Sequence, residues 1–226
     1  MSLTLHLHPL SSYCHKVLIG LYEKGIAFEP RVVNLGDPQE RLSYAELWPT
    51  AKIPLLEDHA AGRVVPETSI MLEYLDRLHP GAPALFPADP ELQMQARLWD
   101  RLFDQYVMTP MQRIIADRLR PEGQRDETSV KEARQLLDMA YGMAERQLAM
   151  HPWAAGPAFT VADCAAAPSL FYAHILQPFG PQHAALAAYF ERLLQRASVQ
   201  RVLQEARPWL QYFPYADQVP ERFLKG

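Results

Sequence analysis

The strongest constraint on the fold is a change of hydrophobic pattern at a proline-dense segment, HPGAPALFPADPE, which covers residues 79–91. Before this segment, short stretches in which apolar and polar residues alternate are interleaved with stretches of helical periodicity. After it, long amphipathic stretches with helical spacing dominate. A dense run of proline is typical of a linker. We therefore predict two domains of different class, residues 1–80 and 91–226, joined by a linker at residues 81–90.

The first domain is expected to mix strands with helices, because segments such as LTLHLH alternate strictly while others repeat at helical spacing. The predicted strands are residues 3–8, 26–35, 52–58 and 63–65. The predicted helices are residues 13–24, 38–47 and 66–81. On the third helix, the residues expected to share one buried face are Ile70, Met71, Tyr74, Leu75 and Leu78. The resulting order, βαβαββα, indicates a four-stranded sheet with one antiparallel hairpin.

The second domain is expected to be entirely helical. Its amphipathic stretches are residues 92–119, 127–150, 161–176, 184–196 and 199–206. The segment FTVADC places Thr160 at an N-cap and Asp163 three residues later, which is the spacing of a capping box with aspartate instead of the usual glutamate. Phe159 and Cys164 occupy the two apolar positions that flank such a box. We therefore predict a firmly started helix after Thr160 and a packing role for Cys164.

Composition and charge exclude several classes of protein. Apolar residues make up 49% of the 226-residue chain, and the net charge of −4 provides no field that would attract nucleic acid or anionic lipid. The two cysteines, Cys14 and Cys164, fit neither a disulfide framework nor a metal site. No apolar run approaches the length of a membrane span, and the first residues lack the pattern of a signal peptide. We expect a soluble cytoplasmic protein with no metal and with neither membrane nor nucleic acid as a partner.

The segment SSYCHKV opens the first predicted helix with Ser11, Ser12 and Cys14. Serine is among the best N-cap residues, so a purely structural role is one interpretation. A helix N-terminus also stabilises a nearby thiolate, and a serine hydroxyl there can donate a hydrogen bond to it. Cys14 itself is either a reactive thiol or a small packing residue, and cysteine is usually buried and inert.

Two further segments have both a structural and a functional interpretation. KIPLL puts Pro54 at the start of a strand, where proline is tolerated, although a cis Ile53–Pro54 bond would direct the Ile53 backbone toward an extended ligand. PETSI puts Glu67 and Thr68 at the start of a helix. They can cap that helix, or they can hold a ligand that carries both an ammonium and a carboxylate group, as a glutamyl group does.

Taken together, the segments SSYCHKV, KIPLL, PETSIMLEYL and FTVADCAAAP resemble the cytosolic glutathione transferase superfamily, in a bacterial type with a serine-type active site. They occur in the family's order, and the resemblance covers nearly the whole chain. It implies a thioredoxin-like N-terminal domain, an all-helical C-terminal domain and a homodimer. It also implies glutathione as cosubstrate and a role in detoxification, with a hydrophobic electrophile as the second substrate.

The resemblance also implies a set of site residues. Ser11 falls where serine-type members place the residue that faces the glutathione sulfur, and it is the predicted catalytic residue. Cys14 matches the second cysteine of a glutaredoxin-like motif, which is not the primary nucleophile. The residues implied for glutathione binding are Lys52, Ile53, Pro54, Glu67 and Thr68. Among these, Glu67 and Thr68 match the pair that holds the γ-glutamyl group, Ile53 pairs with the cysteinyl part, Pro54 is the family's cis-proline, and Lys52 lies near the glycyl end.

The predicted function is activation of the glutathione thiolate for attack on an electrophilic small molecule or a peroxide. Two alternatives remain at the level of the sequence. One is a glutathione-binding or regulatory protein without turnover on the same fold, because a fold does not by itself set a function. The other is a glutathione-dependent enzyme with a different reaction, either a thiol oxidoreductase that uses Cys14 or an isomerase. The absence of a tyrosine from the first predicted strand speaks against the family's tyrosine-type classes.

Overall fold

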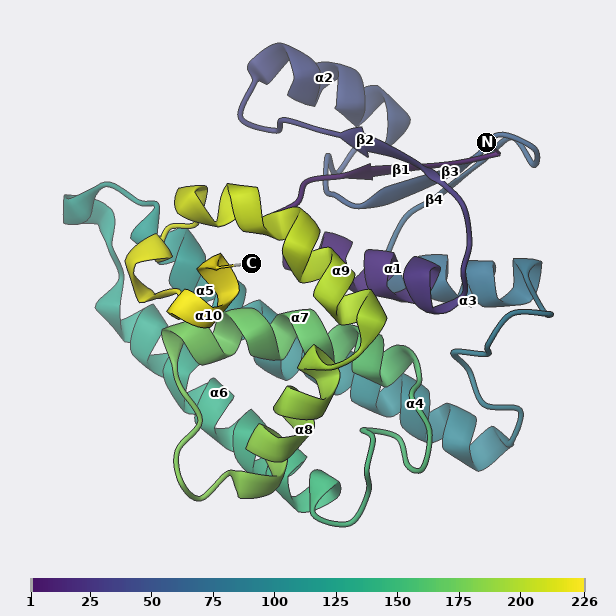
Figure 1. Cartoon of the computed structure of the whole chain (residues 1–226). Helices are drawn as coiled ribbons and strands as arrows, with labels where there is room; N and C mark the ends of the chain where they lie inside the picture. The colour runs from purple at the N-terminus through teal and green to yellow at the C-terminus, as the bar shows by residue number, and fades with distance from the viewer. Residues whose placement is uncertain (1, 226) are drawn as a thin grey trace. The chain divides into compact units, whose positions relative to one another are not determined.

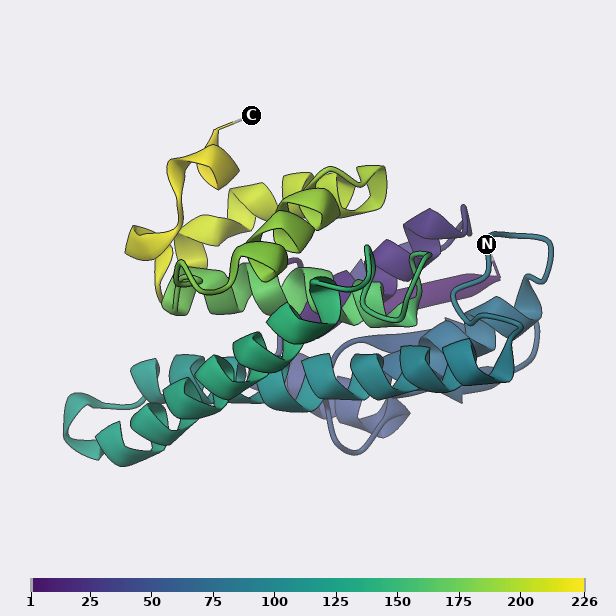
Figure 2. The same ribbon diagram turned by 90° about the horizontal axis from the view of Figure 1, so that it is seen from below.

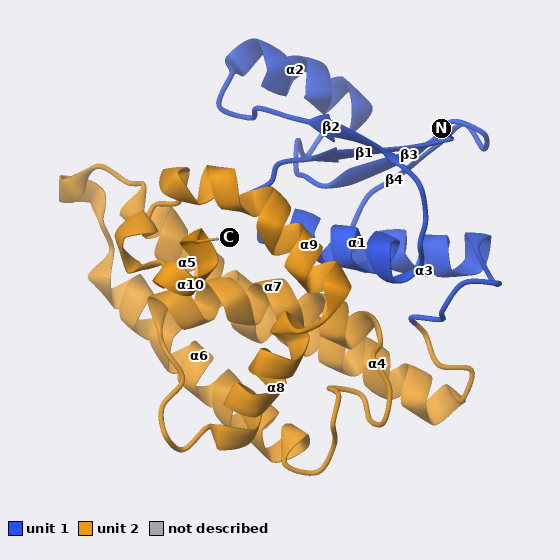
Figure 3. Ribbon diagram, in the orientation of Figure 1, with its two compact units in different colours: residues 1–85 blue, residues 86–226 orange. Residues whose placement is uncertain are grey.

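The computed structural model describes residues 2–225 (Figure 1, and Figure 2 from below). The chain divides into two compact units, with the boundary between Leu85 and Phe86 (Figure 3). The first unit combines a sheet with helices and the second is helical, so the predicted fold class is confirmed. The finer division, with residues 81–90 as a linker, stays a prediction. Within residues 2–225, no helix is both long enough and apolar enough to cross a bilayer.

The first unit has the predicted order of strands and helices. Its elements are β1 (Leu3–Leu7), α1 (Ser12–Glu23), β2 (Glu29–Val32), α2 (Pro38–Leu47), β3 (Leu55–Asp58), β4 (Arg63–Val65) and α3 (Thr68–Leu78). Every residue of β1 is buried, because both faces of this central strand are covered. Helix α2 lies on one face of the sheet, and α1 and α3 lie on the other (Figure 1).

The strand pairing brings three loops to one edge of the sheet. The sheet order is β2-β1-β3-β4, with β2 parallel to β1 and the other two pairs antiparallel. His6 near the end of β1 pairs with Leu55 at the start of β3, and Leu56 pairs with Val65 at the end of β4. The chain therefore leaves β1, enters β3 and leaves β4 at the same edge.

Helices α1 and α3 run parallel to each other, and Gly20 lets them approach closely. A β-carbon on Gly20 would overlap the side chain of Leu72 and would crowd Leu85, so a larger residue at this position would push the helices apart. Leu72 and Leu85 are almost completely buried. The absence of a side chain at Gly20 is therefore a packing requirement of this pair of helices.

Two buried lysines fix the register of this helix pair. Near the start of both helices, Lys16 Nζ donates to Ser69 Oγ at 3.0 Å. Just beyond the end of α1, Lys24 Nζ donates to Asp76 Oδ1 at 2.8 Å and to the carbonyl oxygen of Pro83 at 3.0 Å. Buried lysines occur almost only where the ammonium group has partners. These bonds align the two helices so that their N-termini lie at the same end.

The expected buried face of α3 was wrong in part. Met71 and Leu75 are buried as predicted, but Leu72 is buried as well, while Ile70 and Leu78 are 55% and 44% exposed. The buried face is therefore rotated relative to the one inferred from periodicity. The physical reason is the close approach at Gly20, which draws Leu72 toward α1.

The second unit is a set of helices that differs from the prediction mainly at one break. Its elements are α4 (Pro90–Leu102), the π-helical segment η1 (Phe103–Met108), α5 (Thr109–Arg118), η2 (Glu122–Gln124), α6 (Glu127–Leu148), α7 (Val161–Leu176), α8 (Ala184–Leu194), α9 (Ala197–Ala206), η3 (Arg207–Tyr212), η4 (Ala216–Gln218) and α10 (Glu221–Leu224). The amphipathic stretch predicted over residues 92–119 is thus divided by η1 into α4 and α5. Helices α5 and α6 pack side by side as a hairpin (Figure 2).

The predicted capping box starts the most buried helix of this unit. The Thr160 side chain caps α7, and the Asp163 carboxylate accepts the backbone N–H of Thr160 at 2.8 Å. Asp163 is fully buried and also accepts the N–H of Ala154 at 3.0 Å and the hydroxyl of Tyr189 at 2.5 Å. Burial raises the pKa of this carboxyl, and the hydrogen bond from Tyr189 opposes that shift. Asp163 therefore joins α7, α8 and the preceding loop.

We predict that Asp163→Ala lowers the free energy of unfolding by about 3 kcal/mol, because several buried donors lose their acceptor at once. Urea denaturation followed by circular dichroism measures the change. Thr160→Ser, which keeps a capping hydroxyl, should stay close to the wild type. A loss below about 1 kcal/mol in Asp163→Ala would show that these donors find other partners.

Candidate glutathione site

The three loops at one edge of the sheet contain every site residue predicted from the sequence. The loop after β1 leads to Ser11, the loop before β3 contains residues 52–54, and the segment after β4 leads to Glu67 and Thr68. Because α1 and α3 are parallel, the positive ends of both helix dipoles also lie at this edge. The topology thus gathers the hydroxyls of Ser11 and Thr68, two helix N-termini and a proline loop.

The loop between β1 and α1 is held in place by its own hydrogen bonds. The N–H of Ser11 donates to the carbonyl oxygen of His8 at 2.9 Å, and the N–H of Leu10 donates to His8 Nδ1 at 3.2 Å. From within α1, His15 Nε2 donates to the carbonyl oxygen of Pro9 at 2.6 Å. Burial lowers the pKa of His8, which agrees with a neutral ring whose Nδ1 accepts. These bonds leave little freedom in the position of Ser11.

Ser11 is the N-cap of α1, and its hydroxyl can act both as acceptor and as donor. Its Oγ accepts the N–H of Cys14 at 3.3 Å, so the capping interpretation holds. In that bond the hydroxyl acts only as an acceptor, and its own proton can be donated to another group. Ser11 is half-buried, so a ligand can reach it. Capping and stabilisation of a thiolate are therefore compatible roles for this side chain.

Cys14 lies inside the first turn of α1 and is fully buried. Burial raises the pKa of its thiol to about 12, although hydrogen bonds to Ser11 and to the His8 backbone act in the opposite direction. The thiol therefore stays protonated at neutral pH, and a protonated thiol is a poor nucleophile. Cys164 forms no disulfide and is fully buried, in agreement with its predicted packing role.

The loop before β3 has a residue with positive φ and a cis peptide bond, and one side chain of α2 bonds to it. Ala51 has a positive φ of 47°, and the Ile53–Pro54 peptide bond is cis. The hydroxyl of Tyr44 donates to the carbonyl oxygen of Lys52 at 2.9 Å. Pro54 is buried, whereas the Lys52 side chain is exposed. Tyr44 was not singled out from the sequence, because nothing in its local pattern shows that it reaches a loop eight residues later.

The start of α3 has the second positive φ in a residue other than glycine. Glu67, the N-cap, has φ 65° and ψ 119°, a conformation that costs on the order of 1–3 kcal/mol for such a residue. Within the described chain its side chain makes no capping hydrogen bond. The Glu67 side chain is exposed, while Thr68 is 8% exposed. Strain of this kind persists where the surroundings enforce it, and it is frequent at ligand sites.

Lys16 is a further residue of this region that sequence reasoning missed. It is fully buried and bonds to Ser69, the residue that follows the Glu67–Thr68 pair. From the sequence, Lys16 is a residue one turn into a predicted helix, and nothing in that pattern indicates a contact with Ser69. Among residues 2–225, no group of three or more histidine, cysteine, aspartate or glutamate side chains is arranged as a metal site.

Comparison with known families identifies the type of domain that each unit matches. Residues 5–83 match the N-terminal domain of glutathione S-transferases, and residues 102–197 match the C-terminal domain of the same family. Together these matches cover well over half of the chain.

Individual relatives agree with that assignment. A glutathione S-transferase of Pseudomonas putida is 32% identical over 162 residues, which are 71% of this chain and 70% of the relative. A stringent starvation protein A homolog of Coxiella burnetii is 30% identical over 91% of this chain and 95% of its own length. The crystal structure of a Methylobacillus flagellatus glutathione S-transferase with glutathione bound is 26% identical, with a TM-score of 0.81 over 89% of this chain and 98% of that one. The chain therefore belongs to the cytosolic glutathione transferase superfamily.

Proposed function

We propose that the protein is a glutathione transferase that binds glutathione along the first unit and activates its thiol with Ser11. The observation that carries the proposal is the position of Ser11. It caps a helix whose N-terminus lies at the same sheet edge as the start of α3, and its hydroxyl proton is not used by the cap. A relative of 26% identity that was solved with glutathione bound supports glutathione as the ligand.

In the proposed reaction, Ser11 Oγ–H donates a hydrogen bond to the glutathione sulfur. This bond and the positive end of the α1 dipole favour the thiolate over the thiol. The thiolate sulfur then forms a bond to an electrophilic carbon, whose leaving group departs with its electron pair. With a peroxide, it instead forms an S–O bond to one oxygen while the O–O bond breaks and the other oxygen leaves with the electron pair, to be protonated to an alcohol or water. The enzyme contributes orientation and a lowered thiol pKa, without a covalent intermediate on the protein.

The remaining predicted residues are proposed to hold the rest of glutathione. Glu67 takes the ammonium of the γ-glutamyl group, and Thr68 with the backbone N–H groups at the start of α3 takes its carboxylate. The Ile53 backbone, beside Pro54, pairs with the cysteinyl part. Lys52 is exposed and is assigned to the glycyl carboxylate. The uncapped start of α3 supports this assignment, because the donors there lack a side-chain acceptor from the N-cap residue in the described chain.

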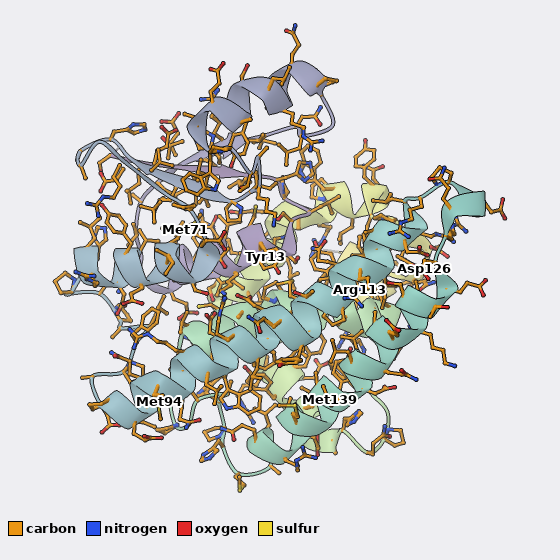
Figure 4. All side chains as sticks on the ribbon, turned by 180° about the vertical axis from the view of Figure 1, so that it is seen from behind. Tyr13, Met71, Met94, Arg113, Asp126 and Met139 are labelled. Atoms are coloured by element: carbon orange, nitrogen blue, oxygen red, sulfur yellow. The ribbon has the colours of Figure 1, made fainter. Side chains whose placement is uncertain are left out.

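We also propose a cytoplasmic homodimer that acts on hydrophobic electrophiles in detoxification. Met94 and Leu98 lie one turn apart on α4 and are 54% and 48% exposed. Tyr106 of η1 and Met139 of α6 are exposed apolar side chains on the same unit, and Met94 and Met139 are marked in Figure 4. Exposed apolar side chains at helical spacing support burial against a second subunit.

A second candidate is a glutathione-binding or regulatory protein without turnover, since one relative of similar length is named as a stringent starvation protein A homolog and not as a transferase. The two candidates differ in a simple observable. A transferase conjugates glutathione to a model electrophile such as 1-chloro-2,4-dinitrobenzene, whereas a regulatory protein binds glutathione without turnover. A protein that neither binds glutathione nor turns over such electrophiles would exclude the proposed function.

The first prediction from this function concerns Ser11. Ser11→Ala should lower kcat for conjugation by about 100-fold, because one hydrogen bond to the developing thiolate is lost. The dissociation constant of glutathione should change little. Ser11→Thr, which keeps a hydroxyl, should retain most of the activity. Steady-state kinetics measure kcat, and calorimetry measures the dissociation constant. A kcat equal to that of the wild type in Ser11→Ala would show that Ser11 acts only as a helix cap.

The second prediction concerns the glutamyl group. Glu67→Ala should weaken glutathione binding by about 10-fold or more, because the ligand ammonium loses a charged partner. Retention on immobilised glutathione, followed by calorimetry, measures the loss. Glu29→Ala is the matched control, since Glu29 is an exposed glutamate of the same unit at the opposite end of the strands. Equal retention of both variants would contradict the role of Glu67.

The third prediction separates the transferase from an oxidoreductase that uses Cys14. With a thiol pKa of about 12, only about one Cys14 side chain in 10⁴ is ionised at pH 8, and the thiol is buried. Iodoacetamide should therefore leave Cys14 unmodified in the folded protein and alkylate it in urea, as mass spectrometry can show. Cys14→Ala should retain conjugation activity. Rapid labelling of Cys14 in the native state would instead support a thiol oxidoreductase that uses this cysteine.

A further inference from the structure

We propose that Tyr44 is a positioning residue for the glutathione site, acting on the Ile53 backbone through the carbonyl oxygen of Lys52. This inference rests on the proposed function and deepens it, because it adds a residue that would act without contacting the ligand. The hydroxyl of Tyr44 donates to the Lys52 carbonyl oxygen at 2.9 Å, directly before Ile53 in the chain. The bond therefore links helix α2 to the loop that is assigned to the cysteinyl part of glutathione.

The side chain of Tyr44 has a fixed position in the first unit. It is 4% exposed and packs with Val33 and Leu55 in one core cluster. Its ring also lies near the ring of His6 on the central strand, with the centroids 5.6 Å apart. Among the residues of α2, all of which the structure describes, Tyr44 is the only buried one. The core of the sheet therefore sets where the hydroxyl lies.

Packing alone does not account for this hydroxyl. A phenylalanine ring would fill the same space in the core, and a buried hydroxyl costs free energy unless it is hydrogen-bonded. Burial raises the pKa of Tyr44, and the Cys14 and Glu57 side chains shift this pKa in the same direction. The hydroxyl therefore stays protonated and acts as a donor toward the Lys52 carbonyl oxygen. The group that distinguishes tyrosine from phenylalanine here is thus directed at the loop.

The loop between α2 and β3 needs support from outside its own backbone. Ala51 has a positive φ of 47°, which is unfavourable for a residue other than glycine. Two backbone bonds close the segment, from Trp48 N to the Tyr44 carbonyl oxygen at 3.3 Å and from Ala51 N to the Trp48 carbonyl oxygen at 2.9 Å. The side-chain bond to Lys52 adds a third. Tyr44 thus holds this segment at its start and again just before Ile53.

Loss of the Tyr44 hydroxyl should therefore affect binding more than chemistry. Without it, the loop samples further conformations, and only a fraction of the molecules presents the Ile53 backbone in the arrangement that binds glutathione. The apparent dissociation constant rises by the inverse of that fraction. Once glutathione is bound, the loop has its productive conformation, and Ser11 meets the sulfur as before. The expected signature is a higher KM for glutathione with an almost unchanged kcat.

The experiment uses the full chain, reduced glutathione and calorimetry, with steady-state conjugation kinetics in parallel. Tyr44→Phe keeps the ring in the core and removes only the hydroxyl. It should raise the dissociation constant and the KM of glutathione by about 5-fold, within the range expected for one hydrogen bond. The kcat should stay within about 2-fold of the wild type. A purely structural role would lower stability and leave the KM of the folded enzyme unchanged.

Tyr74→Phe is the matched control, because the hydroxyl of Tyr74 donates to Asp58 Oδ2 at 2.6 Å, at the opposite end of β3. Both variants remove one tyrosine hydroxyl from the same unit, and both should lower the stability of the fold. Only Tyr44→Phe should change the affinity for glutathione. Unchanged affinity in a folded Tyr44→Phe, or an equal loss in Tyr74→Phe, overturns the inference.

Hydrogen exchange of the Ala51 amide tests the loop in the absence of ligand. Because this N–H donates to the Trp48 carbonyl oxygen, it should exchange slowly in the wild type and about 5-fold faster in Tyr44→Phe. If Tyr44→Phe does not fold, the wild type carries the test: slow exchange of Ala51 supports the inference, and exchange as fast as in an unfolded peptide overturns it. Failure of the wild type to bind glutathione would instead overturn the proposed function, and the inference with it.

Discussion

The parallel packing of α1 against α3 is the constraint on which the rest of the first unit depends. It exists because Gly20 has no side chain, so that Leu72 can fill the space between the helices. A buried lysine on either side of this contact fixes the register. A helix pair in this register must present both N-termini at one end. That end coincides with the sheet edge where β1 and β4 terminate and β3 begins.

This arrangement has a direct chemical consequence. Two helix N-termini at one edge give a region of positive potential made of backbone dipoles, which suits both a thiolate and a carboxylate. The sulfur that the protein itself carries nearby is Cys14, and burial keeps its thiol protonated. The Ser11 hydroxyl at the start of α1 is half-buried and can donate a hydrogen bond, which is why the proposed chemistry uses the sulfur of the ligand.

Much of this fold could be predicted from the sequence. Strict alternation at residues 3–8 identified the central strand, and the capping box at Thr160 and Asp163 identified the start of α7, because both are local patterns. The division of residues 92–119 by η1 was missed, since its residues continue the helical periodicity. The buried face of α3 was misplaced at Ile70, because the neighbour that decides it lies on another helix.

The sequence by itself determined the strands and helices of the first unit, the order in which they follow one another, and the set of residues that resemble a glutathione site. Only the tertiary structure decided that Cys14 is inaccessible, that Tyr44 supports the loop at Lys52, and that Lys16 meets Ser69. The physical reason is that burial and hydrogen bonding depend on which surfaces meet. Lys16 and Ser69 are 53 positions apart, so no local pattern can bring them together.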